Sequence, residues 1–93
     1  MRERDIEEKF RKAVKDCGGL ALKFVSPGFD GMPDRLVLIP DGKLAFVEAK
    51  APGQKPRPLQ LSRHEMLRQM GFNVFVLDSM DEIGVIIDAI RTT

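Results

Sequence analysis

The sequence is poor in the residues that build covalent or metal cross-links. It holds one cysteine, Cys17, and one histidine, His64, in 93 residues. A single cysteine cannot form an internal disulfide, and the two residues together fall short of the ligand count of a structural zinc site. The fold must therefore rest on a hydrophobic core, which is modest in a chain of this length.

Long apolar runs are also missing. The longest apolar segments have the length of a β-strand, and the first ten residues, MRERDIEEKF, alternate charges where an export signal would be apolar. We therefore expect no export and no membrane partner, but a cytoplasmic protein.

The net charge of +1 indicates no partner by itself, but the charges are unevenly distributed. Residues 49–70 hold five lysines and arginines against one acid, whereas residues 71–93 hold four acids and one arginine. This predicts a basic patch near the middle of the chain, of the kind that binds nucleic acid. A solvated charged surface without a ligand would show the same pattern.

Apolar spacing and turn residues predict the order of elements. A spacing of three to four predicts a first helix over residues 3–17, which Gly18 and Gly19 end. Strands are expected over 20–25, 34–39, 43–50 and 73–77, the last one buried on both faces. Further helices are expected over 59–70 and after Ser79, which would cap the last one. The order α-β-β-β-α-β-α favours an α/β class, with a mixed sheet flanked by helices in a single domain over residues 1–93.

The segment Pro40-Asp41-Gly42 predicts a three-residue hairpin loop built on a type I turn with a bulge. Counting back from that loop places Asp34 opposite Glu48, with Cβ atoms roughly 5 Å apart. Lys50 follows Glu48 by two residues on the same strand, so it shares that face. Three charged groups are thus expected at one end of one hairpin.

Facing carboxylates repel each other unless a cation lies between them. Mg²⁺ suits this place because it prefers oxygen ligands, and Mn²⁺ could substitute for it. Lys50 would then orient or help to deprotonate an attacking water and stabilise charge on a phosphate. The set predicts metal-assisted phosphodiester hydrolysis. The alternative is that Asp34 caps a turn while Glu48 and Lys50 lie on an exposed strand face.

Three linked motifs make the chemistry more specific. They are Gly31-Met32-Pro33-Asp34-Arg35, Phe46-Val47-Glu48-Ala49-Lys50-Ala51-Pro52 and Pro58-Leu59-Gln60. With them, the chain resembles the stand-alone VRR-NUC family of phage and bacterial nucleases, within the PD-(D/E)xK superfamily, from about Ile6 to Leu77. Met32 stands where that family usually has valine, and the loop around Phe29-Asp30 is less basic than in relatives.

The resemblance implies a restriction-endonuclease-like fold, a divalent-metal site and a dimeric enzyme that cuts branched DNA such as four-way (Holliday) junctions, in a bacterium or a phage-infected host cell. It makes Asp34 and Glu48 metal ligands, the Ala49 carbonyl a further ligand, and Lys50 the catalytic lysine. It also matches Gln60 to the family's glutamine at the start of the second helix.

The family's first-helix glutamate corresponds to Glu7 or Glu8. Glu7 lies beside the apolar stripe of its helix and Glu8 on the opposite face. We therefore expect Glu7 to join the catalytic set and to reach the metal directly or through water. Gln60 shares a helix face with Leu67, which turns it toward the sheet and Lys50, although it could simply cap its helix.

The remaining expectations concern partners. We expect His64 to be an exposed helix residue without a catalytic role. The last helix carries four isoleucines and, off their stripe, Val85, which is more apolar surface than one core face needs and predicts a homodimer contact there. A catalytically inactive DNA-binding module and an RNA-directed nuclease are the alternative functions. Five basic residues are expected to contact DNA phosphates, namely Lys23, Arg35, Lys55, Arg57 and Arg63.

Overall fold

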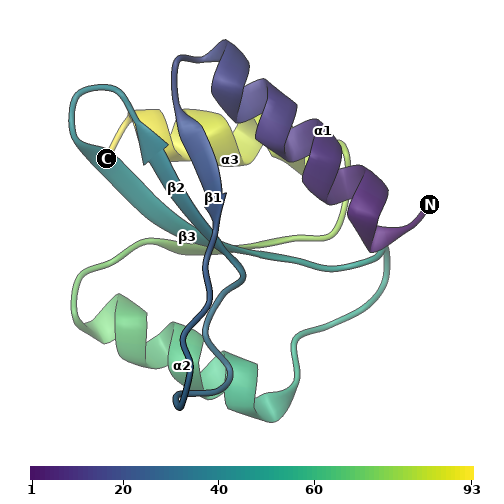
Figure 1. The fold of residues 1–93 in the computed structure, drawn as a ribbon, viewed down its shortest axis with the longest axis vertical. Coiled ribbons are helices and arrows are strands. Elements are labelled where there is room, and N and C mark those ends of the chain that lie inside the picture. Colours follow the sequence, from purple (N-terminus) through teal and green to yellow (C-terminus); the bar gives the residue numbers. More distant parts are fainter.

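A computed structural model describes residues 1–93 (Figure 1). Its strands are β1 (Leu20–Lys23), β2 (Arg35–Ile39), β3 (Lys43–Ala49) and β4 (Val74–Leu77), and its helices are α1 (Glu3–Asp16), α2 (Pro58–Gln69) and α3 (Glu82–Arg91). The order α-β-β-β-α-β-α and the mixed sheet confirm the predicted fold class. None of the three helices combines the length and the hydropathy needed to cross a bilayer.

The four strands form one sheet in the order β1-β2-β3-β4. β1, β2 and β3 are antiparallel neighbours, while β4 pairs parallel to β3 after the connection through α2. Figure 1 shows α1 and α3 on one face of the sheet and α2 on the other. The larger core lies under α1 and α3, and a smaller cluster of Phe46, Leu67 and Val74 lies under α2.

The hairpin of β2 and β3 has the predicted register but not the predicted turn. Ile39 pairs with Lys43 and Arg35 pairs with Val47, so one further step places Asp34 opposite Glu48. The φ angles of Asp41 and Gly42 are 75° and 72°. A type I turn needs negative φ at its second corner, so that prediction was wrong. Asp41 can adopt this left-handed conformation because its short polar side chain tolerates it.

Three local predictions fail around β4 and α3. β4 lies at a sheet edge, so Phe75 and Val76 are only partly buried. Ser79 is not the cap of α3, because its Oγ accepts a hydrogen bond from the Asp81 N–H in the turn before the helix. The isoleucines of α3 pack into the chain's own core and cannot form the predicted dimer contact, whereas Val85, off their stripe, stays 61% exposed; the buried residues are Ile83, Ile86, Ile87 and Ile90.

Candidate active site

The predicted catalytic residues converge at the open end of the β2–β3 hairpin. Asp34 lies directly before β2, Glu48 lies near the end of β3, and Lys50 follows that strand. The Asp34 Oδ1 accepts a hydrogen bond of 3.2 Å from the Ala49 N–H. The backbone of β3 therefore holds the Asp34 carboxylate next to Glu48.

Glu48 is the centre of the polar contacts. It is 3% exposed, and its Oε2 lies 3.4 Å from the Lys50 Nζ. The same oxygen accepts a hydrogen bond of 3.2 Å from the Gln60 Nε2. The Gln60 Oε1 accepts a hydrogen bond from the Arg57 N–H at 2.8 Å, so Gln60 both caps α2 and contacts Glu48. The two roles considered for Gln60 are thus compatible.

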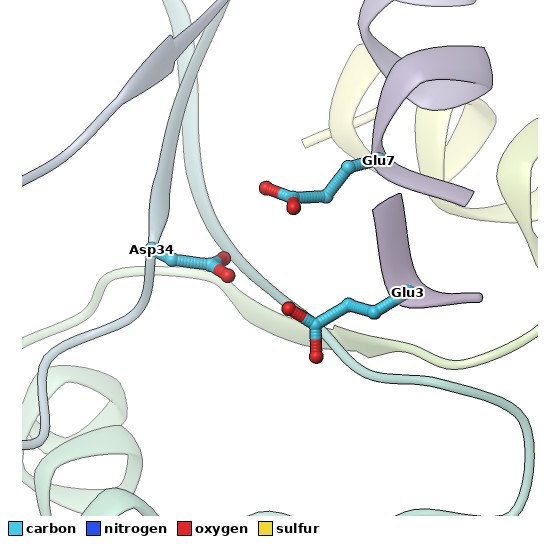
Figure 2. A group of neighbouring side chains, drawn as sticks. All are labelled: Glu3, Glu7 and Asp34. Carbon is cyan, nitrogen blue, oxygen red and sulfur yellow. The ribbon is translucent and has the colours of Figure 1, made fainter. Parts of the chain in front are cut away.

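α1 adds two carboxylates to the site (Figure 2). Glu7 faces Asp34, whereas Glu8 is exposed and pairs with Arg11. Glu3 was not among the predicted residues. One carboxylate oxygen from each of Glu3, Glu7 and Asp34 lies within 4.8 Å of the others. The four-residue spacing of Glu3 and Glu7, which puts both on one helix face, was the signal in the sequence.

His64 is fully buried, at 0% exposed, so the prediction of an exposed residue was wrong. It follows Gln60 by one helical turn on the face of α2 that packs against the sheet, and its Nε2 lies 3.8 Å from the Glu48 Oε1. Burial lowers the pKa of His64, and the charges of Arg68 and Lys50 act in the same direction. The imidazole is therefore neutral at neutral pH.

The two hairpin carboxyls hold their protons more tightly than usual. Burial raises the pKa of Asp34 to about 6, with Glu7 and Glu3 adding to the rise and the Ala49 N–H opposing it. Burial raises the pKa of Glu48 to about 7, with Asp34 adding to the rise and Lys50 opposing it. A hard divalent cation with oxygen ligands would offset this accumulated negative charge and favour the ionised form of all these acids. The residues present thus fit such an ion.

Two of the arginines predicted to contact DNA are engaged within the protein. The Arg35 Nε donates to the Glu7 Oε1 at 3.1 Å, and its Nη1 donates to the Ala21 carbonyl at 3.1 Å. The Arg63 Nε donates to the Asp30 carbonyl at 2.8 Å, while its guanidinium lies 3.9 Å from the centre of the Phe29 ring. The other three residues, Lys23, Lys55 and Arg57, are exposed.

The loop over residues 24–34 lies against α2. At Gly31 the φ angle is 90°, and a Cβ there would lie 2.9 Å from the Leu59 Cγ and 3.1 Å from the Arg63 Cγ. Only glycine combines that conformation with such a close approach. Together with Arg63, this packing fixes the segment that delivers Asp34 to the site.

An acid before one strand and an E-x-K pair on the next, in a mixed sheet between helices, define the class of PD-(D/E)xK nuclease domains. The family model for the VRR-NUC domain matches residues 2–81, and the chain belongs to this family. The chain is 54% identical over 81 residues to a protein named "Putative nuclease p44" from Acyrthosiphon pisum secondary endosymbiont phage 1, and the match covers 87% of each chain. A solved structure of a VRR_NUC domain superposes with a TM-score of 0.86 at 37% identity, covering 92% of this chain and 94% of the other.

Proposed function

We propose that this protein is a Mg²⁺-dependent endodeoxyribonuclease that hydrolyses phosphodiester bonds in branched DNA, such as four-way junctions. The observation that carries the proposal is the convergence of Asp34, Glu48 and Lys50 at one hairpin end, with Gln60 bonded to Glu48. Membership of a nuclease-domain family supports the reaction class. The preference for branched DNA rests on the family resemblance.

Asp34 and Glu48 would hold the metal, with the Ala49 carbonyl and Glu7 as further ligands. Glu3 joins this set because its carboxylate lies beside those of Glu7 and Asp34. When bound, Mg²⁺, or Mn²⁺ in its place, polarises the phosphate and makes a bound water more acidic. The raised pKa values of Asp34 and Glu48 support this assignment, because they indicate a site with too much negative charge for its burial.

The chain's other residues then have separate tasks. Lys50 is mostly buried with its Nζ beside Glu48, where its ammonium would orient the attacking water and stabilise charge at the phosphate. Arg35 balances the charge of Glu7 and holds its side chain in place. Lys23, Lys55 and Arg57 have free charges that would contact the DNA backbone.

We further propose a homodimer, which would suit paired cuts in a symmetric junction. Because the isoleucines of α3 are buried, Val85 is the large apolar residue that this helix leaves exposed, and a dimer would need a further apolar surface. The free edge of the sheet at β1 carries Leu20 and Leu22, which are 54% and 43% exposed, and Val25 follows at 68%. An apolar edge strand is a surface through which two copies of a protein can pair.

The test is cleavage of labelled four-way junction, splayed-arm and plain duplex DNA with Mg²⁺, with Mn²⁺ and with chelator. The Lys50→Ala variant is compared with wild type, and Lys12→Ala on the exposed side of α1 serves as a matched control. The proposal expects metal-dependent cutting that Lys50→Ala abolishes and Lys12→Ala retains. Tight binding without cutting in any metal would indicate an inactive docking module, and faster cutting of matched RNA would overturn the assignment of DNA as substrate.

A further inference from the structure

The buried face of α2 carries an imidazole for which the proposed mechanism has no task. His64 is fully buried, and neither of its ring nitrogens has a hydrogen-bond partner. The oxygen that it faces, Glu48 Oε1, is equally buried and equally without a partner. Buried polar atoms are nearly always hydrogen-bonded because an unmade bond is costly. Two unpaired groups that face each other beside the catalytic acids therefore point to an interaction between them.

The distance supports a direct contact. The His64 Nε2 and the Glu48 Oε1 are 3.8 Å apart, about 0.8 Å more than an ordinary N–H···O hydrogen bond. A small rotation of either side chain closes that gap. A water between the two groups would need two hydrogen bonds in series, which span more than about 4 Å. The two side chains thus fit each other directly.

We propose that His64 is a positioning residue for Glu48, donating a hydrogen bond from Nε2 to Oε1. Gln60, one helical turn earlier, donates to Oε2. α2 thereby contacts both oxygens of one carboxylate and fixes its plane. With Oε1 held against the helix, Oε2 is the oxygen that faces Lys50. This inference rests on the proposed function, because it gives Glu48 the role of a metal ligand.

According to this proposal, Glu48 needs the hydrogen-bond donor of His64, and not only a side chain of the same volume. Partners that orient a ligand commonly change metal affinity by about 10- to 100-fold when they are removed. His64→Leu fills the buried space without a donor, and His64→Met is a second donorless variant in case the leucine fails to fold. His64→Gln keeps an N–H near the position of Nε2. Leu67→Met is the matched control, because it alters the same buried helix face without touching Glu48.

The first measurement is calorimetric titration of Mn²⁺ into the DNA-free protein, with thermal unfolding of each variant in chelator beside it. We expect His64→Leu or His64→Met to bind Mn²⁺ about 10- to 100-fold more weakly, while His64→Gln and Leu67→Met stay close to wild type. Wild-type affinity in a folded donorless variant would overturn the proposal. So would a His64→Gln variant as weak as His64→Leu, because shape would then matter rather than the donor.

The second measurement is nitrogen NMR of the His64 ring in the metal-free protein, which does not depend on nuclease activity. The proposal expects the tautomer that carries its hydrogen on Nε2, and the Nδ1 tautomer would overturn it. If the ring shows the Nε2 tautomer but the wild type cuts no nucleic acid, the proposed function fails while the contact between His64 and Glu48 stands.

Discussion

Replacing Asp34 by asparagine should stabilise the metal-free protein while it removes activity. The pKa of Asp34 is raised to about 6 in the folded chain from an ordinary value of 3.8. The folded state therefore binds this proton more tightly than the unfolded state does. The resulting stability is fully present below about pH 4 and is lost as the pH rises through about 6. Asparagine stays neutral throughout, and its side-chain oxygen can still accept the Ala49 N–H.

The size of the expected gain in stability follows from the shift in the pKa of Asp34. Each pKa unit corresponds to about 1.4 kcal/mol, so the rise from 3.8 to about 6 sets an upper bound of about 3 kcal/mol. Asp34 is only partly buried, and solvent screening reduces the expected gain to about 1–2 kcal/mol. For a chain of this length that gain raises the unfolding temperature by roughly 5–10 °C.

The assay is thermal unfolding of wild type and Asp34→Asn in chelator at about pH 4 and about pH 8. We expect the variant to be the more stable protein near pH 8 and the difference to shrink toward pH 4. Added Mg²⁺ should raise the unfolding temperature of wild type near pH 8 and leave the variant almost unchanged. An asparagine variant that is no more stable than wild type near pH 8, or a gap that does not depend on pH, would refute the reasoning.

Three further predictions concern the neighbouring residues. Because the pKa of Glu48 is raised to about 7, the initial rate of cleavage at limiting Mg²⁺ should increase as the pH rises through about 7. At saturating Mg²⁺ the same increase should occur at lower pH, because the metal competes with the proton for the carboxylate. Gln60→Ala should lower the unfolding free energy by about 1 kcal/mol through the lost helix cap, and it should slow cleavage while DNA affinity, measured in chelator, changes little. Arg57→Ala should weaken DNA binding and reduce the salt dependence of the binding constant by about one phosphate contact. Arg63→Ala should leave that salt dependence unchanged, because its guanidinium is bonded to the Asp30 carbonyl, and equal slopes for the two arginine variants would contradict this distinction.

The hairpin that carries Asp34 and Glu48 could be predicted because its geometry is local. A three-residue loop sets the pairing, and the alternation of side chains along a strand then places the acids on one face. The turn type was wrong without consequence for the register, because the loop length alone fixes the pairing of Ile39 with Lys43. The choice of Glu7 over Glu8 followed from helix periodicity in the same way, and the structure turns Glu7 toward Asp34.

What the sequence could not provide is the position of one element against another. The spacing of Glu3 and Glu7 puts both on one face of α1, but only the packing of α1 against the sheet shows that this face lies beside Asp34. His64 was expected in solvent because polar side chains usually lie there. Only the packing of α2 against the sheet shows that His64 lies next to Glu48. For the isoleucines of α3, a pattern of apolar residues does not say whether the chain's own core or another copy covers them, and the structure places them in the core.

The buried polar side chains, which are exceptions to the usual apolar interior, are concentrated at one place. Most of the buried side chains are apolar, whereas Glu48, Gln60 and His64 are the buried polar ones, and they adjoin one another beside Asp34. Such local conflicts are expected where function, rather than stability, has set the residues. The gain expected for Asp34→Asn measures one part of this conflict in the absence of metal. If a bound cation removes the conflict, Mg²⁺ should stabilise the wild type near neutral pH much more than it stabilises Asp34→Asn. The two measurements together therefore test whether the acids at this hairpin are arranged for a metal ion.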